Sequence, residues 1–248
     1  MSILCSYPRG LAFLWANFHW RLIAIFGKLG LLDDDNIYAV PRVLLGAFGV
    51  VTIGMFLPQT MFWGEWEFPV LATLSPSSDL PHVWPTSGLL GFEMDSGLNC
   101  VIVGVCKLIA ISFTVAGGYR GGFSKSTLLP CMSTFFCILV SQSSPLSFTV
   151  FPFFTAGAAF GRGLCFVFPT LSPVIATLCF AAGINVAITR TALATSLILA
   201  FLAGEQLALP AILAASVASL FATSYMPFIK SQIARSDIDS SLFMDKNQ

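Results

Sequence analysis

Residues 117–123 read Gly-Gly-Tyr-Arg-Gly-Gly-Phe, and residues 151–162 read Phe-Pro-Phe-Phe-Thr-Ala-Gly-Ala-Ala-Phe-Gly-Arg. The first segment is a glycine cluster, and the second has the small residues of a closely packed helix. Glycines let several backbone N–H groups converge on one point, and a helix N-terminus adds partial positive charge. Pro152 suits the first turn of such a helix, because a backbone N–H at that position would have no acceptor within the helix, so its absence costs nothing. Together the two segments predict an anion-binding loop that leads into a helix.

The composition of the chain indicates a membrane protein. Of the 248 residues, 56% are apolar and only 10% are charged, and the mean hydropathy is +0.85. Ordinary globular proteins are much less apolar. A bilayer span takes roughly 20 apolar residues, so we expect an all-α, polytopic helix bundle with about six spans. The formal net charge is zero, which gives no reason to expect a nucleic-acid partner.

Three regions follow from the distribution of apolar and charged residues. Residues 1–41 mix aromatic and basic side chains, which predicts an interfacial or partial helix. Residues 42–235 form the expected transmembrane region. Residues 236–248 are polar, and we expect a disordered tail there.

Apolar runs bounded by glycine, proline or polar residues predict individual helices within the transmembrane region. We expect helices over residues 43–57, 98–115, 152–168, 173–188, 192–203 and 209–223, with an extramembrane loop over residues 75–96. Gly157 and Gly161 have G-x-x-x-G spacing, which favours close contact between helices in lipid.

Lys107 interrupts one of the expected spans. A buried ammonium is costly in lipid, so this side chain should face the protein interior, a partner or a water-filled cavity. Two roles remain open. Lys107 either has a structural ion pair or carbonyl partner, or it contacts a transported species directly.

Cysteine and histidine residues give no sign of a catalytic or metal site. The seven cysteines lie mostly in apolar runs without a Cys-x-x-Cys pair, which indicates buried free thiols. The two histidines are far apart in the sequence, and the sequence shows no motif that pairs a nucleophile with a base. We therefore expect neither an enzyme nor a bound cofactor.

The interval 124–149 differs from its flanks in being rich in serine and proline, and its apolar centre is too short to span a bilayer. We interpret it as an insertion. Without this interval the flanking segments read Gly-Gly-Phe-x-Phe-Pro, followed by Thr-Ala-Gly-Ala-Ala-Phe-Gly-Arg. This pattern resembles the second-half anion motif of the ClC family of voltage-gated chloride channels and chloride/proton antiporters, in which G-x-F-x-P leads into a G-A-A-x-G helix.

Three flanking features agree with this resemblance, which covers roughly residues 42–235. The segment from Gly46 to Pro58, with Trp-Gly-Glu at residues 63–65, is similar to the family's glycine helix and its following loop. Lys107 falls where the family often has a basic residue. Residues 189–193, Thr-Arg-Thr-Ala-Leu, resemble the Thr-Arg-x-Pro-Leu turn.

The resemblance implies the C-terminal part of an inverted-repeat fold, with broken helices that point their N-termini at chloride near the membrane midplane. Carried over to this chain, the motif is filled by Gly122, Phe123, Val150, Phe151 and Pro152. Backbone amides between Phe123 and Phe151 are the expected chloride ligands. The expected partners are chloride, a lipid membrane and a second copy of the chain, in a homodimer with one pathway per subunit.

The sequence also departs from the family pattern. The first-half motifs G-S-G-I-P and G-[KR]-E-G-P do not occur, residues 124–149 split the remaining motif, and Ile229 stands where many members have a tyrosine on the last helix. Two hypotheses result. The chain serves chloride transport as a ClC-type channel or antiporter that is incomplete as written. Alternatively, it is a non-conducting truncated or mis-spliced membrane protein, or a half-protein that assembles with a partner.

Overall fold

The structure is a computed structural model, which describes residues 2–31, 39–61, 71–72, 74, 89–117, 150–204 and 206–224. For residues 2–9, 39, 150 and 151 it describes the backbone alone. The described chain forms seven α-helices: α1 (Ser2–Lys28), α2 (Ala39–Phe56), α4 (Gly97–Ala116), α6 (Val150–Val167), α7 (Pro173–Thr189), α8 (Ala192–Ala203) and α9 (Leu209–Thr223). Two short 3-10 helices accompany them, η2 (Pro58–Thr60) and η5 (Gln206–Ala208). The expected all-α class is confirmed for these residues.

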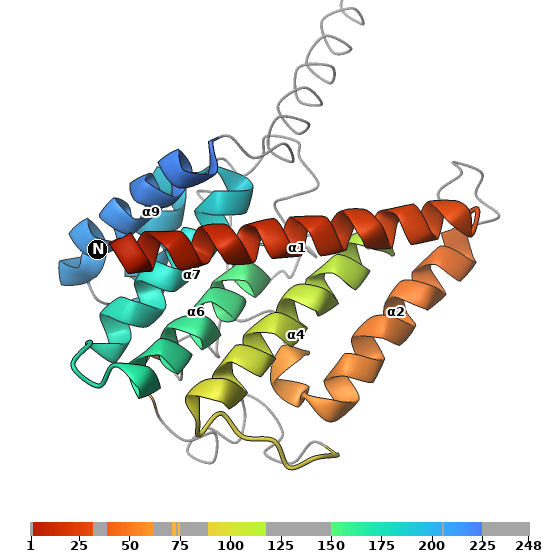
Figure 1. The fold of residues 1–248 in the computed structure, drawn as a ribbon, viewed down its shortest axis with the longest axis horizontal. Helices are drawn as coiled ribbons and strands as arrows, with labels where there is room; N and C mark the ends of the chain where they lie inside the picture. The colour runs from red at the N-terminus through yellow and green to blue at the C-terminus, as the bar shows by residue number, and fades with distance from the viewer. Residues whose placement is uncertain are drawn as a thin grey trace, which may run out of the picture.

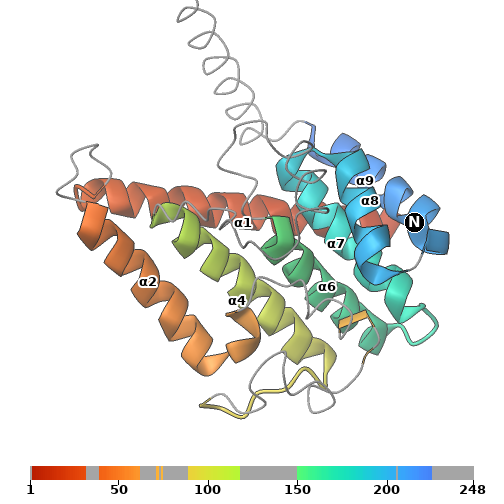
Figure 2. The same cartoon turned by 180° about the vertical axis from the view of Figure 1, so that it is seen from behind.

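The helices pack in a row around α6. Helix α4 lies on one side of α6 and α7 on the other, α2 packs outside α4, and α8 and α9 pack against α7 (Figure 1). Helix α1 crosses one face of this row and contacts α4, α7 and α9. The reverse view shows the row from the side that α1 does not cover (Figure 2). Helix α6 is therefore the central element, flanked on both sides by other helices.

The close approach of α6 and α7 depends on glycines. A Cβ built on Gly161 would lie 2.6 Å from the Cα of Thr177, and one built on Gly157 would meet the backbone of α7 as closely. Real Cβ atoms do not come this near to a backbone, so only glycine allows the two helices to touch here. The G-x-x-x-G spacing thus marks a helix–helix contact, as expected from the sequence.

Helix boundaries follow ordinary local signals. Helix α4 begins after Ser96, whose side chain accepts a hydrogen bond from the backbone N–H of Asn99 at 3.3 Å. Pro173 is the first residue of α7, where a missing N–H costs nothing. Helix α8 ends at Gly204, which adopts a φ of 66° in the left-handed region. These signals explain why the observed ends agree with the expected ones to within a few residues.

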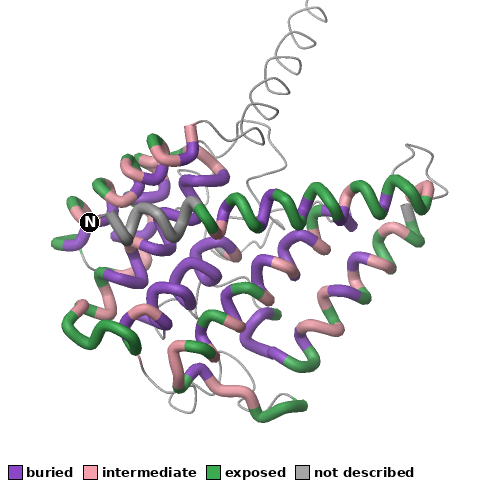
Figure 3. Tube along the Cα trace, in the orientation of Figure 1, coloured by how far each residue is buried: buried purple, intermediate pink, exposed green. Residues whose placement is uncertain are grey.

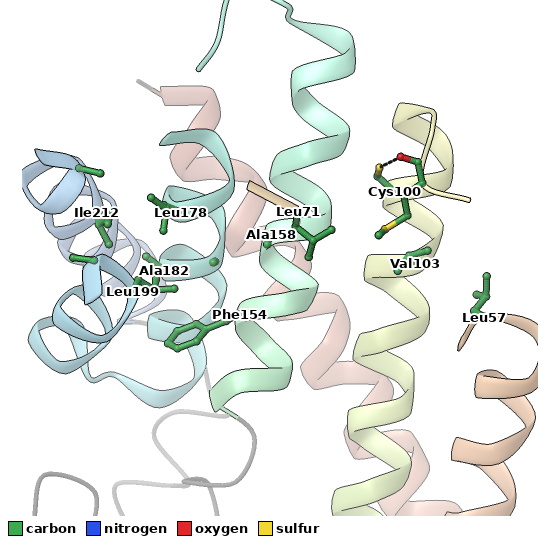
Figure 4. Packing of buried hydrophobic residues seen from close by; sticks show 14 residues of the cluster. Leu57, Leu71, Cys100, Val103, Phe154, Ala158, Leu178, Ala182, Leu199 and Ile212 are labelled. Carbon is green, nitrogen blue, oxygen red and sulfur yellow. Dashed lines mark hydrogen bonds between the residues drawn. The ribbon is translucent and has the colours of Figure 1, made fainter. Parts of the chain in front are cut away.

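Two apolar clusters fill the interior on either side of α6. In the first, Phe154 and Ala158 of α6 lie toward Leu178 and Leu199 (Figure 4). In the second, Phe153 of α6 packs with side chains from α1, α4 and α7. Helix α6 therefore buries both of its flanks, which holds its first turn in a fixed position.

Region 1–41, for which the sequence predicts an interfacial or partial helix, contains helix α1. Helix α1 buries Ala12, Trp15, Leu22 and Phe26 against its neighbours. Its opposite face exposes apolar side chains such as Leu14, 66% of whose surface is accessible. The element is thus an integral part of the bundle, and its depth relative to a membrane stays a prediction.

Two helical stretches, Gly97–Ala116 and Gln206–Thr223, are long and apolar enough to cross a membrane by length and composition. Shorter apolar helices run over Val40–Phe56, Pro173–Thr189 and Ala192–Ala203. Buried positions are concentrated in α6 and α7, and exposed positions lie along α1 and α2 (Figure 3). The length and composition of these helices permit a membrane protein.

Candidate functional site

The end of α4 and the start of α6 lie at the same end of the bundle. The two helices are antiparallel, because Gly97 of α4 lies against Gly163 of α6, and Gly104 of α4 lies against Phe160. In the sequence the glycine cluster follows the end of α4, and the Phe-Pro pair at residues 151–152 lies at the start of α6. Residues 118–149 between them lie outside the described part of the chain.

Helix α6 begins within the candidate motif. Val150 and Phe151 are its first two residues, and Pro152 is its third and is half-buried. The first N–H groups of an α-helix have no acceptor within the helix. The backbone donors of Val150 and Phe151 belong to this group, so the start of α6 presents N–H donors together with the positive end of the helix dipole. Proline in the first turn is confirmed.

Other predicted positions lie outside the described residues. They comprise Gly122 and Phe123 of the motif, the interval 124–149, the Trp-Gly-Glu segment at residues 63–65, Ile229 and the tail 236–248. The predicted convergence of Gly122, Phe123, Val150, Phe151 and Pro152 on one ion therefore stays a prediction.

An aromatic group fixes α1 beside the first turn of α6. The ring of Phe153 meets Trp15 edge-on, with ring centroids 5.0 Å apart, and His19 stacks on Trp15 at 5.2 Å. The indole Nε1 of Trp15 donates a hydrogen bond to the carbonyl oxygen of Leu108 at 3.0 Å. Trp15 therefore ties α1 to α4 and to the start of α6 at once.

A chain of polar side chains lies at the turn between α7 and α8. Asn185 is fully buried, and its Nδ2 donates to the hydroxyl of Thr195 at 2.9 Å. The hydroxyl of Thr191 lies 3.4 Å from that of Thr195 and 3.0 Å from that of Thr189. Since α7 runs antiparallel to α6, this turn lies at the same end of the bundle as the start of α6. The N-termini of α6 and α8 thus occupy one end of the protein.

Arg190 ends α7 in an unusual conformation. Its φ is 61°, in the left-handed region, and its N–H bonds to the carbonyl oxygen of Val186 at 3.0 Å. The side-chain atoms Nε and Nη2 are buried and have no hydrogen-bond partner within the described part of the chain. A cation at a helix C-terminus is favoured by the helix dipole, which gives Arg190 a structural reason to lie there.

Two more cationic side chains are buried inside the bundle. The Nζ of Lys107 donates to the carbonyl oxygen of Thr60 at 2.9 Å, and only 4% of the residue is exposed. The prediction that Lys107 faces the protein interior is confirmed, and its carbonyl partner matches the structural alternative. Arg162 of α6 is equally buried, with Nη2 3.5 Å from the carbonyl oxygen of Leu74.

Sequence reasoning did not single out Asn185, Thr195 or Arg162 as candidate residues. One usable signal was present, since each is a polar residue within an otherwise apolar helix. Among the described cysteines, Cys100 and Cys165 are free and buried, as expected, whereas Cys106 and Cys179 are free and half-buried. Among the described residues no group of three metal-binding side chains lies together.

Comparison with known proteins identifies no relative. No family model matches the chain, and no curated protein or solved structure matches it.

Proposed function

We propose that this chain is a multi-pass integral membrane protein that serves chloride transport, and that chloride binds at the start of α6. In this proposal the motif Gly122, Phe123, Val150, Phe151 and Pro152 is the second half of a ClC-type anion pathway. The motifs of the first half do not occur in this sequence. In the proposal, further sequence or a separate partner chain supplies that half of the pathway. Transport mode, channel or antiporter, is left open because the residues that distinguish the two belong to the first half.

The distribution of charge supports a membrane location. Helices α7, α8 and α9 contain no charged residue, and the single charges within α4 and α6, Lys107 and Arg162, are buried. The outer surfaces of these helices are apolar, with Leu193 and Phe201 exposed by 70% and 67%. Soluble proteins rarely expose so large an apolar surface to water, whereas membrane proteins expose such a surface to lipid. Ionisable residues in membrane spans normally face the bundle interior, as Lys107 and Arg162 do.

One observation carries the anion assignment. Helices α4 and α6 are antiparallel, so the end of α4, which the glycine cluster follows in the sequence, lies toward the same end of the bundle as the start of α6 at Val150. A glycine segment beside the free N–H groups of a helix N-terminus is the arrangement with which proteins bind small anions. Irregular backbone within a membrane protein is tolerated where it lines such an ion site.

The decisive experiment measures both chloride binding and chloride flux. The full chain is purified, and sodium chloride is titrated into it by calorimetry in a gluconate buffer. The same protein is reconstituted into phosphatidylcholine/phosphatidylglycerol vesicles, and chloride efflux is followed with a chloride electrode. Phe151→Glu should abolish binding, because a carboxylate near the helix N-terminus competes with the anion for the same positive potential.

The matched control places the same charge at the other end of the helix. Phe168 follows the last residue of α6 and is 47% exposed, so Phe168→Glu should leave chloride binding unchanged. Absence of binding by the unsubstituted chain would contradict the proposal. Equal loss in both variants would show that the added charge acts through folding instead of through the site.

The interval 124–149 favours a second candidate function. It separates Phe123 from Val150 in a motif that should be continuous, which favours a non-conducting protein or a half-protein that needs a partner. Binding of chloride without efflux from the vesicles is the expected result for this alternative. Efflux from vesicles that contain only this chain would exclude it.

A homodimer is part of the first proposal. The exposed apolar side chains of α8 and α9, among them Leu197, Phe201 and Phe221, offer a surface that lipid or a second copy can cover. Chemical crosslinking in membranes, with the mass of the crosslinked species as the readout, tests this assembly.

A further inference from the structure

Four residues at the turn between α7 and α8 form a closed ring of hydrogen bonds. The Nδ2 of Asn185 donates to the hydroxyl of Thr195 at 2.9 Å, and the hydroxyl of Thr189 donates to the backbone carbonyl oxygen of Asn185 at 2.9 Å. Between these two bonds, the hydroxyl of Thr191 lies 3.4 Å from that of Thr195 and 3.0 Å from that of Thr189. The ring therefore begins and ends at Asn185.

The direction of every bond in this ring is fixed, because each threonine hydroxyl has a single proton. Thr189 uses its proton on the carbonyl oxygen of Asn185, so Thr191 must be the donor in its contact with Thr189. Thr195 must then donate to Thr191, while it accepts from Asn185. All hydroxyl protons of the ring are in use, and only acceptor capacity remains.

The most deeply buried of the remaining acceptors is the amide oxygen of Asn185. The residue is 0% exposed, and its Oδ1 has no hydrogen-bond partner among the described residues. A polar atom buried among apolar helices costs free energy unless it is hydrogen-bonded, and almost all such atoms in folded proteins have a partner. Oδ1 therefore calls for a donor.

The other buried hydroxyl groups on the described helices α7, α8 and α9 do not supply this donor, because their protons are used elsewhere. Backbone carbonyl oxygens accept from Thr177, Ser196, Ser219 and Thr223. Ser216 is then the donor in its 3.0 Å contact with Ser196. A small ligand is the remaining source of a donor for Oδ1.

The charge of the turn favours water over a metal cation as this ligand. Helices α7, α8 and α9 contain no acidic side chain, and Arg190, between Thr189 and Thr191 in the chain, already brings one positive charge. Thr191 is exposed, so one edge of the ring reaches the protein surface. Water also suits the amide of Asn185 in both of its orientations, since it can donate to Oδ1 or accept from Nδ2.

We infer that Asn185 binds a buried water molecule through Oδ1, beside the ring that it forms with Thr189, Thr191 and Thr195. Buried waters typically make about three hydrogen bonds to otherwise unsatisfied polar groups. The threonine oxygens of the ring each keep a lone pair that can accept from the same water. The water is thus part of the polar core of the α7–α8 hairpin, and the site is independent of the proposed chloride site.

Water-edited solid-state NMR of the full chain in phosphatidylcholine/phosphatidylglycerol vesicles tests this site. The readout is polarisation transferred from water protons to Cγ of Asn185. No substitution is needed for the assignment, because Ile184–Asn185 is the sole Ile–Asn pair in the sequence and can be labelled selectively. Ser216 is the matched control, since it is also 0% exposed and its hydroxyl pairs with a second buried hydroxyl. Ser216–Val217 is likewise the sole Ser–Val pair.

Transfer to Asn185 at mixing times at which Ser216 receives none is the result expected for a bound water. Equal transfer to both residues would show that exchange of buried hydroxyl protons is the source, and absence of transfer to Asn185 would show a dry site. Either result overturns the inference. The cation is tested by replacing sodium chloride with choline chloride. A shift of the Asn185 Cγ resonance without transfer from water would assign the position to sodium and also overturn the inference.

Discussion

Gly157 of α6 lies directly against the backbone of Ala181 in α7, so that a Cβ built on Gly157 would be 2.5 Å from the Cα of Ala181. The contact lies in the middle of the bundle, where neither helix can move without disturbing both apolar clusters. The spacing between α6 and α7 thus depends on the absence of a methyl group at Gly157, as it also does at Gly161.

Gly157→Ala should therefore destabilise the protein. The new methyl group must push α7 away, and overpacking of this kind costs about 1–3 kcal/mol of unfolding free energy. Thermal unfolding of the purified protein in detergent measures the change. Gly10 of α1 has open space around its Cβ position, so Gly10→Ala should not destabilise the protein. Equal stability of the two variants would contradict the observed closeness of α6 and α7.

The same pair shows what the sequence can predict. Gly157 and Gly161 are four residues apart, and this local spacing alone indicates a face for close packing. The helices at residues 98–115 and 192–203 could likewise be placed, because apolar runs and end signals are local. The structure gives them as Gly97–Ala116 and Ala192–Ala203.

Contacts between distant residues could not be predicted in this way. Arg42 and Ala116 are 74 positions apart, and their hydrogen bond exists only because α2 folds back antiparallel on α4. Asn185 meets Thr195 because the left-handed residue Arg190 turns the chain between α7 and α8. Such relationships depend on the path of the chain in three dimensions, which no residue spacing specifies.

Thr195→Val should destabilise the α7–α8 hairpin. The substitution keeps the shape of the side chain but leaves Nδ2 of the fully buried Asn185 without its acceptor. Side-chain hydrogen bonds between membrane helices contribute about 0.6 kcal/mol on average and up to about 1.7 kcal/mol. A double-mutant cycle with Asn185→Ala, read by thermal unfolding, measures the coupling.

The control for this cycle is an exposed hydroxyl. Thr52 of α2 bonds to the carbonyl oxygen of Phe48 within its own helix, so Thr52→Val should have almost no effect on stability. A coupling energy near zero between Asn185 and Thr195 would show that their hydrogen bond contributes nothing to the hairpin.

Lys107→Met distinguishes the two roles left open for this side chain. The carbonyl oxygen of Thr60 loses its charged donor, which should lower the unfolding free energy by about 1.5–3 kcal/mol. In the structural role, chloride affinity stays unchanged, because Lys107 then acts only through its hydrogen bond to the carbonyl oxygen of Thr60. Lys28→Met, at an exposed position in the last turn of α1, serves as the control. A large loss of chloride affinity at unchanged stability would instead support direct contact with the transported ion.

Phe48→Arg tests whether the outer face of α2 lies in lipid. Phe48 is near the middle of α2 and is 70% exposed, with Leu44 and Val51 exposed beside it. An arginine at the centre of a span costs about 2.5–3.5 kcal/mol for insertion, so the variant should be largely lost from the membrane fraction. Leu207 is 94% exposed and is the second residue of the candidate span Gln206–Thr223. A long arginine side chain at the end of a span can reach the membrane surface, so Leu207→Arg should insert normally. Normal membrane recovery of both variants would mean that the α2 face meets water, and the charge-free outer surfaces of α7, α8 and α9 would then need a protein partner to cover them.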